Sequence, residues 1–226
     1  MAEFDASAWI SRAQASTIAI GRVSGAVVRA TTVASPTTVA EMQAIERALG
    51  ATIPASLRSL FTRGASAVDC SYVLTPEGDQ LERLRAILPD ETRIFGGARL
   101  SPASELVDNC SAVREWARET WIADDPDARS MWESALPFLR LDSGDYLALD
   151  LRAAVSEPPV AYLSHDDESF LLGPTLVAFL VAWERLCYLG PEHWLLDPFR
   201  DDAGYLDADS EQAAELRELL GPTSTR

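Results

Sequence analysis

The run His165-Asp166-Asp167-Glu168 places a histidine beside three carboxylates, and these side chains offer the most chemistry in the sequence. Such groups can ligate a divalent metal, or they can act as a base with an orienting carboxylate. Neighbours on one loop do not converge on a common point without a group from elsewhere, and the other histidine, His193, stands in no motif. We therefore expect an exposed acidic turn that contacts a partner, with a metal site or a hydrolytic site as the alternative.

A second acidic group lies between two apolar runs, in the stretch from Asp142 to Asp145. Gly144 supplies the backbone freedom that a hairpin turn needs, and Asp142 and Asp145 can accept hydrogen bonds from neighbouring amides. Two carboxylates on one turn can also bind a cation or serve as acid and base. Because a calcium loop has denser oxygen ligands at alternating positions, the pattern favours a capped turn. Asp150 falls on the partly polar face of the strand that follows.

Other catalytic signatures are absent from the sequence. It contains no phosphate loop, dinucleotide fingerprint or nucleophile elbow. The three cysteines, Cys70, Cys110 and Cys187, are an odd number without close spacing, which argues against a disulfide framework and against a zinc site. We expect a protein that is not an enzyme, with no cofactor and no bound metal.

The net charge of the chain indicates which classes of partner it can bind. The 226 residues carry a formal net charge of −16, and all 19 basic residues are arginine. An acid excess of this size repels nucleic acid and anionic membranes, so a cationic protein is the natural complement, with simple surface solubility as the alternative. Trp116, Trp121 and Trp132 are expected in core or lid positions, because a surface that stacks on bases also needs basic residues around it.

The elements around these groups follow from caps and periodicity. Thr38 to Glu41 forms a capping box for a helix that ends at Gly50, and Pro54 begins a second helix. A hairpin over 136–151, a strand over 159–164 and a helix from Thr175 follow later. We divide the chain into an N-terminal extension (1–35), a domain (36–196) and an acidic helical tail (197–226). No apolar run approaches a membrane span and the first residues lack a basic signal-peptide start, so we expect a cytoplasmic protein.

The order of these motifs resembles the SUKH superfamily, which includes fungal cell-wall-assembly regulators and bacterial toxin-immunity proteins. The resemblance covers residues 36–196. It rests on the helix Thr38–Gly50, Ile53-Pro54, Gly144-Asp145-Tyr146 with Leu149-Asp150-Leu151, Pro159-Val160 with His165-Asp166, and Gly190-Pro191-Glu192. Two departures are Ile53, where leucine is usual, and Thr62-Arg63-Gly64, where the family often has asparagine and two glycines.

The resemblance implies an α+β domain with a mostly antiparallel sheet, helices packed on one side, and a protein-binding surface in place of an active site. Bacterial relatives often neutralise a toxin, commonly a nuclease. We therefore expect an immunity protein that binds a basic toxin, with an intracellular scaffold or regulator as the first alternative and a hydrolase or metal enzyme using His165 as the second. The expected partner-binding residues are Asp145, Asp150, His165, Asp166, Asp167 and Glu168.

Overall fold

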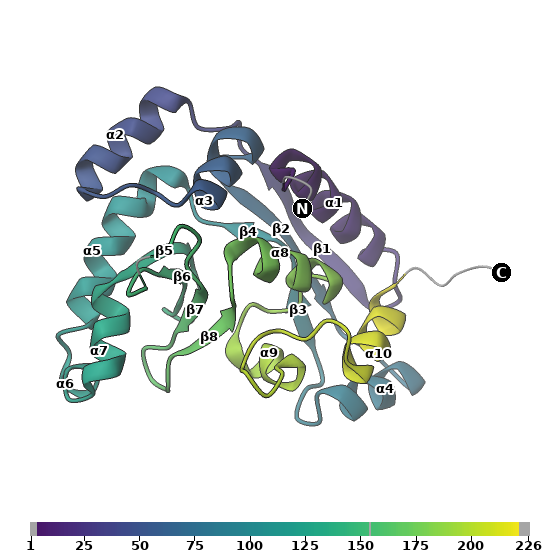
Figure 1. Ribbon diagram of the computed structural model, residues 1–226. Helices are drawn as coiled ribbons and strands as arrows, with labels where there is room; N and C mark the ends of the chain where they lie inside the picture. The colour runs from purple at the N-terminus through teal and green to yellow at the C-terminus, as the bar shows by residue number, and fades with distance from the viewer. Residues whose placement is uncertain (1–3, 154, 222–226) are drawn as a thin grey trace.

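The computed structural model describes residues 4–153 and 155–221, which form two four-stranded antiparallel sheets with helices around them (Figure 1). In the first sheet β2 (Val68–Leu74) pairs with β1 (Ala26–Val33), β3 (Ile94–Gly96) and β4 (Arg99–Leu100). In the second sheet the strands follow chain order, as β5 (Ala135–Arg140), β6 (Tyr146–Asp150), β7 (Val160–Leu163) and β8 (Phe170–Gly173). The predicted α+β class with antiparallel sheets is confirmed.

The helices of the described chain are mostly short. They are α1 (Ala6–Ile20), α2 (Val39–Leu49), α3 (Ala55–Ser59) with a π-helical turn over Leu60–Gly64, α4 (Asp79–Ile87), α5 (Leu106–Trp116), α6 (Thr120–Ala123), α7 (Pro126–Glu133), α8 (Leu176–Arg185), α9 (His193–Leu196) and α10 (Glu211–Leu220). None of these described helices combines the length and apolar character that a bilayer span requires. Short 3₁₀ turns cover Ala103–Glu105 and Asp197–Phe199.

Several helix starts are those that the sequence predicts. Thr38 Oγ1 accepts a hydrogen bond from Glu41 N (3.2 Å), while the Glu41 carboxylate accepts one from Thr38 N (2.8 Å). Gly50 ends α2 in the left-handed region with φ +66°. Thr175 Oγ1 likewise accepts from Ala178 N (3.2 Å) at the start of α8. Each side chain therefore satisfies an amide that the first helical turn leaves without a partner.

Both faces of the second sheet are buried. Residues such as Leu147 and Tyr162 face the large core that contains α8 and the first sheet. Alternate residues such as Ala148 and Leu163 face a smaller core formed with α5 and α7. This double covering explains why every residue of β6 is buried, and it leaves the strand ends and their loops as the places where the sheet meets solvent.

The N-terminal segment belongs to the first sheet. β1 pairs with β2 along its length, from Ala26 opposite Leu74 to Val33 opposite Val68, and Trp9 of α1 is buried. Trp9 Nε1 donates to the carbonyl of Leu180 in α8 (3.2 Å). Of the proposed terminal segments, residues 1–3 and 222–226 lie outside the described residues. The described part of the first segment is therefore joined to the rest by both backbone pairing and core packing.

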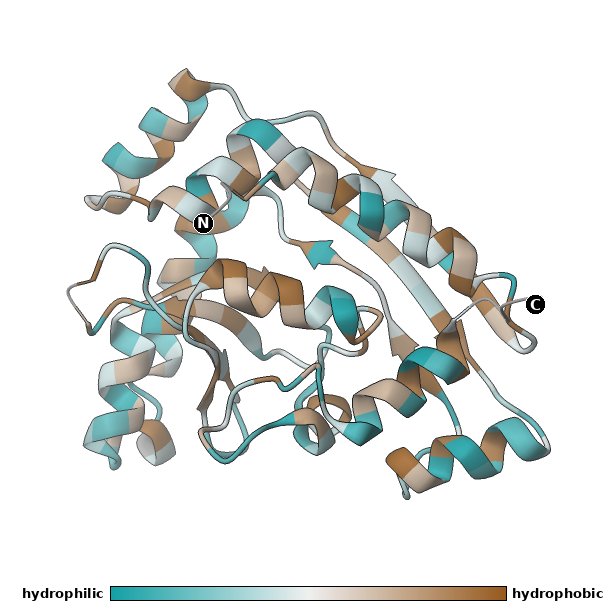
Figure 2. Ribbon diagram, turned by 45° about the vertical axis from the view of Figure 1, so that its right-hand side comes forward, coloured by the Kyte–Doolittle hydropathy of each residue, from teal (hydrophilic) through white to brown (hydrophobic). Residues whose placement is uncertain are grey.

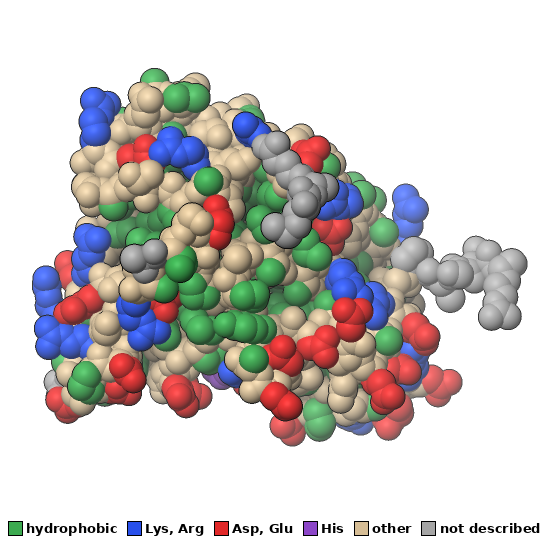
Figure 3. Space-filling view, viewed as in Figure 1, with side chains coloured by type: hydrophobic (Ala, Val, Ile, Leu, Met, Phe, Trp, Pro, Cys, Tyr) green, Lys and Arg blue, Asp and Glu red, His purple; other side chains and the backbone are tan. Residues whose placement is uncertain are grey.

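Charge is distributed unevenly over the surface. From Asp197 to Glu218 the sequence has eight acidic residues, at positions 197, 201, 202, 207, 209, 211, 215 and 218, against Arg200 and Arg217. Figure 3 shows acidic side chains gathered at the lower right, around α4 and α10, beside a hydrophobic area in the centre of the view. Figure 2 shows α8 as hydrophobic along most of its length, with hydrophilic residues at its C-terminal end.

The turn between β5 and β6 generates a stability prediction. Gly144 has φ +104°, a conformation that side chains with a Cβ rarely adopt, and the added atom would otherwise meet only ordinary contacts at the His165 ring. Gly144→Val should therefore lower the free energy of unfolding by about 1–3 kcal/mol through backbone strain. Denaturant unfolding measures the loss, with Asp142→Ala in the same turn as the control. An unchanged midpoint for Gly144→Val would contradict the assigned turn geometry.

Candidate functional site

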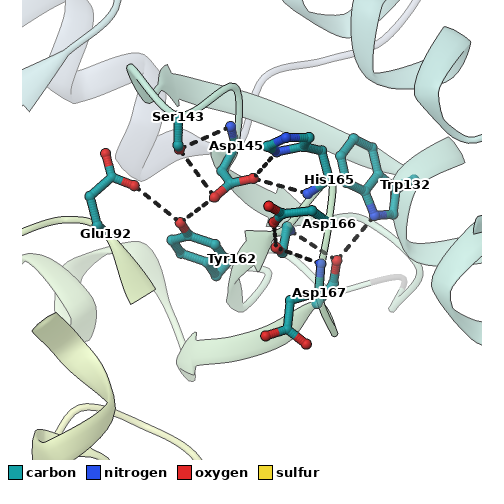
Figure 4. A network of polar contacts seen from close by, with 10 residues as sticks. Trp132, Ser143, Asp145, Tyr162, His165, Asp166, Asp167 and Glu192 are labelled. Carbon is teal, nitrogen blue, oxygen red and sulfur yellow. Dashed lines mark hydrogen bonds and ion pairs between the residues drawn. The ribbon is translucent and has the colours of Figure 1, made fainter. Parts of the chain in front are cut away.

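The second sheet brings Asp145 and His165 together although they lie far apart in sequence. β6 and β7 pair with Tyr146 opposite Leu163, so the residues just beyond these strand ends meet. His165 Nδ1 lies 2.6 Å from Asp145 Oδ1, and the His165 backbone N–H donates to the same oxygen at 2.9 Å (Figure 4). The sheet register thus supplies the group from elsewhere in the chain that the acidic turn lacked.

The second carboxylate oxygen of Asp145 is also fully engaged. Tyr162 Oη donates to Oδ2 at 2.6 Å, and Ser143 Oγ donates to the same oxygen at 3.1 Å. The residue is 2% exposed. Burial acts to raise the pKa of Asp145, but hydrogen bonds from Tyr162, His165 and Ser143 outweigh it, so the pKa is lowered and the carboxylate is held ionised.

Glu192 is a second buried carboxylate in the same network. The Tyr162 hydroxyl lies 3.4 Å from Glu192 Oε2. Burial is the largest influence and raises the pKa of Glu192; the nearby negative charges of Asp145 and Asp142 add to the rise, and together they outweigh the lowering by the hydroxyl groups of Ser143 and Tyr162. Two carboxylates with pKa values displaced in opposite directions form a pattern found at acid–base sites, and also in structural networks.

The surroundings of the network favour a structural role. Asp145 and Glu192 are both buried, which keeps substrate away from them. Among the described residues no hydroxyl or thiol bonds to the His165 ring, so the Asp–His pair has no nucleophile to activate. The ring packs instead on Trp116 of α5, with centroids 5.4 Å apart. The arrangement fixes the position of the loop that begins at His165.

Asp145, His165 and Asp166 could also be considered as metal ligands. One atom from each lies within 4.8 Å of the others. However, Asp145 Oδ1 already accepts two hydrogen bonds from His165, and an ion at this point would have to replace the bond to Nδ1. The donor set is therefore satisfied by hydrogen bonding within the protein.

The three acidic residues after His165 are exposed. Ser164 Oγ accepts from Asp167 N (3.1 Å), and Ser169 Oγ accepts from Ser164 N (3.2 Å), so both ends of the turn are anchored. Ser169 Oγ also accepts from Trp132 Nε1 (3.1 Å). The exposed carboxylates are those of Asp166, Asp167 and Glu168. They are thus presented to solvent from an ordered base.

Two of the predicted partner-binding residues are not on the surface. Asp145 is enclosed by the network described above, and Asp150 is 5% exposed. Asp150 is paired with Arg152, whose Nη2 lies 2.7 Å from Oδ2. The expectation that Asp145 and Asp150 form part of an exposed acidic surface is therefore wrong, because hydrogen bonds and ion pairing hold both carboxylates below it. His165 is partly exposed.

A hollow of 430 Å³ lies beside the exposed turn, between it and α6 and α7. Four carboxylates and two tryptophans line it together with Arg152: Asp125, Asp127, Asp167, Glu168, Trp121 and Trp132. Trp132 is buried as predicted, whereas Trp121 is 45% exposed. We call this site the acidic hollow.

The sequence interpretation missed half of the acidic hollow. Its signal was the run from Trp121 to Asp127, in which an aromatic residue precedes three acids. The sequence alone does not place this run beside Asp167 and Glu168, because only the fold brings the two segments together. A carboxylate-lined hollow with an exposed indole suits a cationic side chain, which both groups attract.

Comparison with known proteins gives one family. The model of the SMI1 / KNR4 family (SUKH-1) matches residues 36–182, which is more than half of the chain. The matched region includes the β5–β6 turn and the loop from His165 to Glu168, and it ends before Glu192. No curated protein matches the chain.

Removing the charge of Asp145 should destabilise the fold. In Asp145→Asn the amide group faces hydrogen-bond donors, so we expect a loss of about 1–3 kcal/mol at neutral pH. Because the folded pKa lies below the unfolded value of about 3.9, the contribution of Asp145 is present above that value and is lost as pH falls through the folded pKa. The difference in the free energy of unfolding between wild type and Asp145→Asn should therefore become smaller in acid. Denaturant unfolding across pH tests this, with exposed Asp142→Asn as the control. Equal stability at neutral pH would contradict it.

Because Asp145 and His165 are already hydrogen-bonded to each other, we predict that this group binds no metal ion. Purified protein should carry no stoichiometric zinc, iron or manganese, and elemental analysis measures this directly. One equivalent of metal that survives gel filtration, and that disappears in His165→Ala, would identify a metal site and reverse this interpretation.

Proposed function

We propose that this chain, which belongs to the SMI1 / KNR4 family (SUKH-1), is a non-catalytic domain that binds a basic partner protein, and that the partner is a toxin which the chain neutralises in the cytoplasm as an immunity protein. The acidic hollow is the observation that carries the proposal. Within the part of the chain that the structure describes, its four carboxylates take part in no ion pair, and the guanidinium of the nearby Arg152 is paired with Asp150.

Electrostatics support a basic partner. With a net charge of −16 the protein attracts cationic proteins over a distance set by salt, and complementary charge raises the association rate and orients the encounter. A lysine or arginine of the partner that enters the acidic hollow would meet carboxylates from both the turn and α7, and the exposed face of Trp121.

The absence of an assembled nucleophile supports binding over catalysis. Within the described chain the His165 ring is committed to Asp145 and to packing against Trp116. SUKH-1 membership accords with toxin-immunity or regulator roles. The alternative is therefore a scaffold or regulator with an endogenous partner, and an adjacent toxin gene is expected only for the immunity protein.

Asp166→Asn combined with Asp167→Asn tests the exposed acidic turn, in which Asp167 lines the acidic hollow. Asparagine keeps the shape of the turn, so the fold should survive, while the association rate with the neighbouring toxin should fall several-fold at low salt and lose part of its salt dependence. Rate measurements across salt and survival on co-expression provide the readouts.

The matched control is Asp79→Asn combined with Asp90→Asn, which removes the same charge from exposed positions at the start of α4 and shortly after its end. Equal rates for the two double variants would place the interface elsewhere. Wild-type protein that neither binds nor protects against a linked toxin would exclude the immunity role, and binding to an endogenous protein would favour the regulator.

A further inference from the structure

The outward face of α8 has no polar residue along its central turns. Phe179, Leu180 and Trp183 point into the core. On the opposite side Val177, Ala178, Val181 and Ala182 are partly or fully exposed, and Val181 is 44% exposed. Ala182 packs partly against the core, whereas Ala178 and Val181 are exposed. A helix at the surface of a domain normally carries charged or polar residues on its solvent side, so Ala178 and Val181 are apolar at positions where the core does not need them.

The exposed side of α8 forms the floor of a groove of 700 Å³. Phe4, Leu206 and Ala208 add apolar walls, and Ser56, Glu157, Thr175, Arg185, Asp207 and Asp209 add polar ones. The hydrophobic area in the centre of Figure 3 lies over α8. We call this site the α8 groove. None of its lining residues lines the acidic hollow.

The rim of the α8 groove is acidic. Its one basic residue, Arg185, is paired with Asp209, with Nη1 3.0 Å from Oδ2. Glu157 and Asp207 add negative charge. One oxygen of the Glu157 carboxylate accepts a hydrogen bond from the backbone N–H of Ser56 at 3.2 Å. Among the described residues its other oxygen is buried without a hydrogen-bond partner. The acidic segment 197–218 contains the Asp207–Asp209 wall and continues the negative charge beyond it.

The apolar floor and acidic rim of the α8 groove favour one kind of binding partner. An apolar centre with a polar rim is the usual organisation of a protein interface. A second copy of this chain would bring acidic rim against acidic rim, with −16 on each copy, so self-association is opposed by repulsion. A partner that places an apolar side chain in the centre and basic side chains at the edge satisfies both the shape and the charge.

We infer that the α8 groove is a second docking surface, which takes an amphipathic helix of the partner protein that carries arginine or lysine beside its apolar face. The inference rests on the proposed function, in which the partner is a basic protein. The groove accepts apolar side chains over Ala178 and Val181, and the rim carboxylates hold the flanking cations.

A pair of synthetic peptides tests the groove without the toxin. One is a helix-forming peptide with leucines at i, i+3, i+4 and i+7 flanked by arginines, and the other has glutamate in place of each arginine. Each is titrated into the full-length, isotope-labelled protein while backbone amide shifts are followed. We expect the arginine peptide to move the amides of α8 and the segment around Asp207, and the glutamate peptide to leave them unchanged.

Val181→Gln supplies the decisive variant. It removes the central apolar contact without changing charge or core packing, so the affinity for the arginine peptide should fall about tenfold. Val39→Gln is the matched control, because Val39 is 63% exposed on α2, outside the groove, and should leave the affinity unchanged.

Four results would overturn the inference. They are equal peptide affinity in wild type and Val181→Gln, equal binding of the two peptides, no shift in α8 up to millimolar peptide, and a wild-type dimer that Val181→Gln dissolves. The last would identify a second copy as the occupant. Because these measurements need no toxin and alter none of the acidic-hollow residues, failure here is distinguishable from failure of the proposed function.

Discussion

The buried carboxylate of Asp145 is the constraint on which the loops of the second sheet depend. An ionised carboxylate that leaves water costs several kcal/mol unless its oxygens are hydrogen-bonded. The donors come from the β5–β6 turn through Ser143, from β7 through Tyr162, and from the next loop through His165. Packing of His165 on Trp116 extends the same constraint to α5. One charge thus fixes the relative positions of a turn, a strand, a loop and a helix.

This constraint divides the acidic motifs into a structural part and an exposed part. The carboxylates of Asp145 and Asp150 are buried, where Asp145 accepts hydrogen bonds and Asp150 pairs with Arg152. Asp166 to Glu168 keep their charge at the surface, on a turn that Ser164 and Ser169 anchor. A surface that is ordered before binding loses less conformational entropy when a partner arrives. In the proposed function, the buried network therefore supports recognition without contacting the partner.

Local signals predicted much of the fold, whereas long-range pairing decided the rest. The cap at Thr38 and the turn at Gly144 are local, and both have the expected geometry. Thr17, Ile18 and Ile20 near the end of α1 are residue types that favour strands, yet Thr17 and Ile20 are buried on the core side of a helix, so packing overrides propensity. The sequence analysis predicted no strand between the acidic turn and the helix that begins at Thr175. β8 has only four residues there, and its pairing with β7 is what makes it a strand. The meeting of Asp145 with His165 needs the β6–β7 register, which a single sequence does not specify.

The two proposed surfaces differ in the physical quantity that they govern. Charge at the acidic hollow acts through water at a distance, and its main effect is on how often and in which orientation the partner arrives. Apolar contact in the α8 groove has no effect until water has been expelled, so it governs how long the complex lasts. An inhibitor needs both, since a fast encounter that dissociates quickly leaves a toxin active, and a long-lived complex that forms slowly leaves it active at the start. Residues 206–209 of the acidic segment 197–218 line the α8 groove, so charge that attracts a basic partner to this segment also brings it to the surface that we propose retains it.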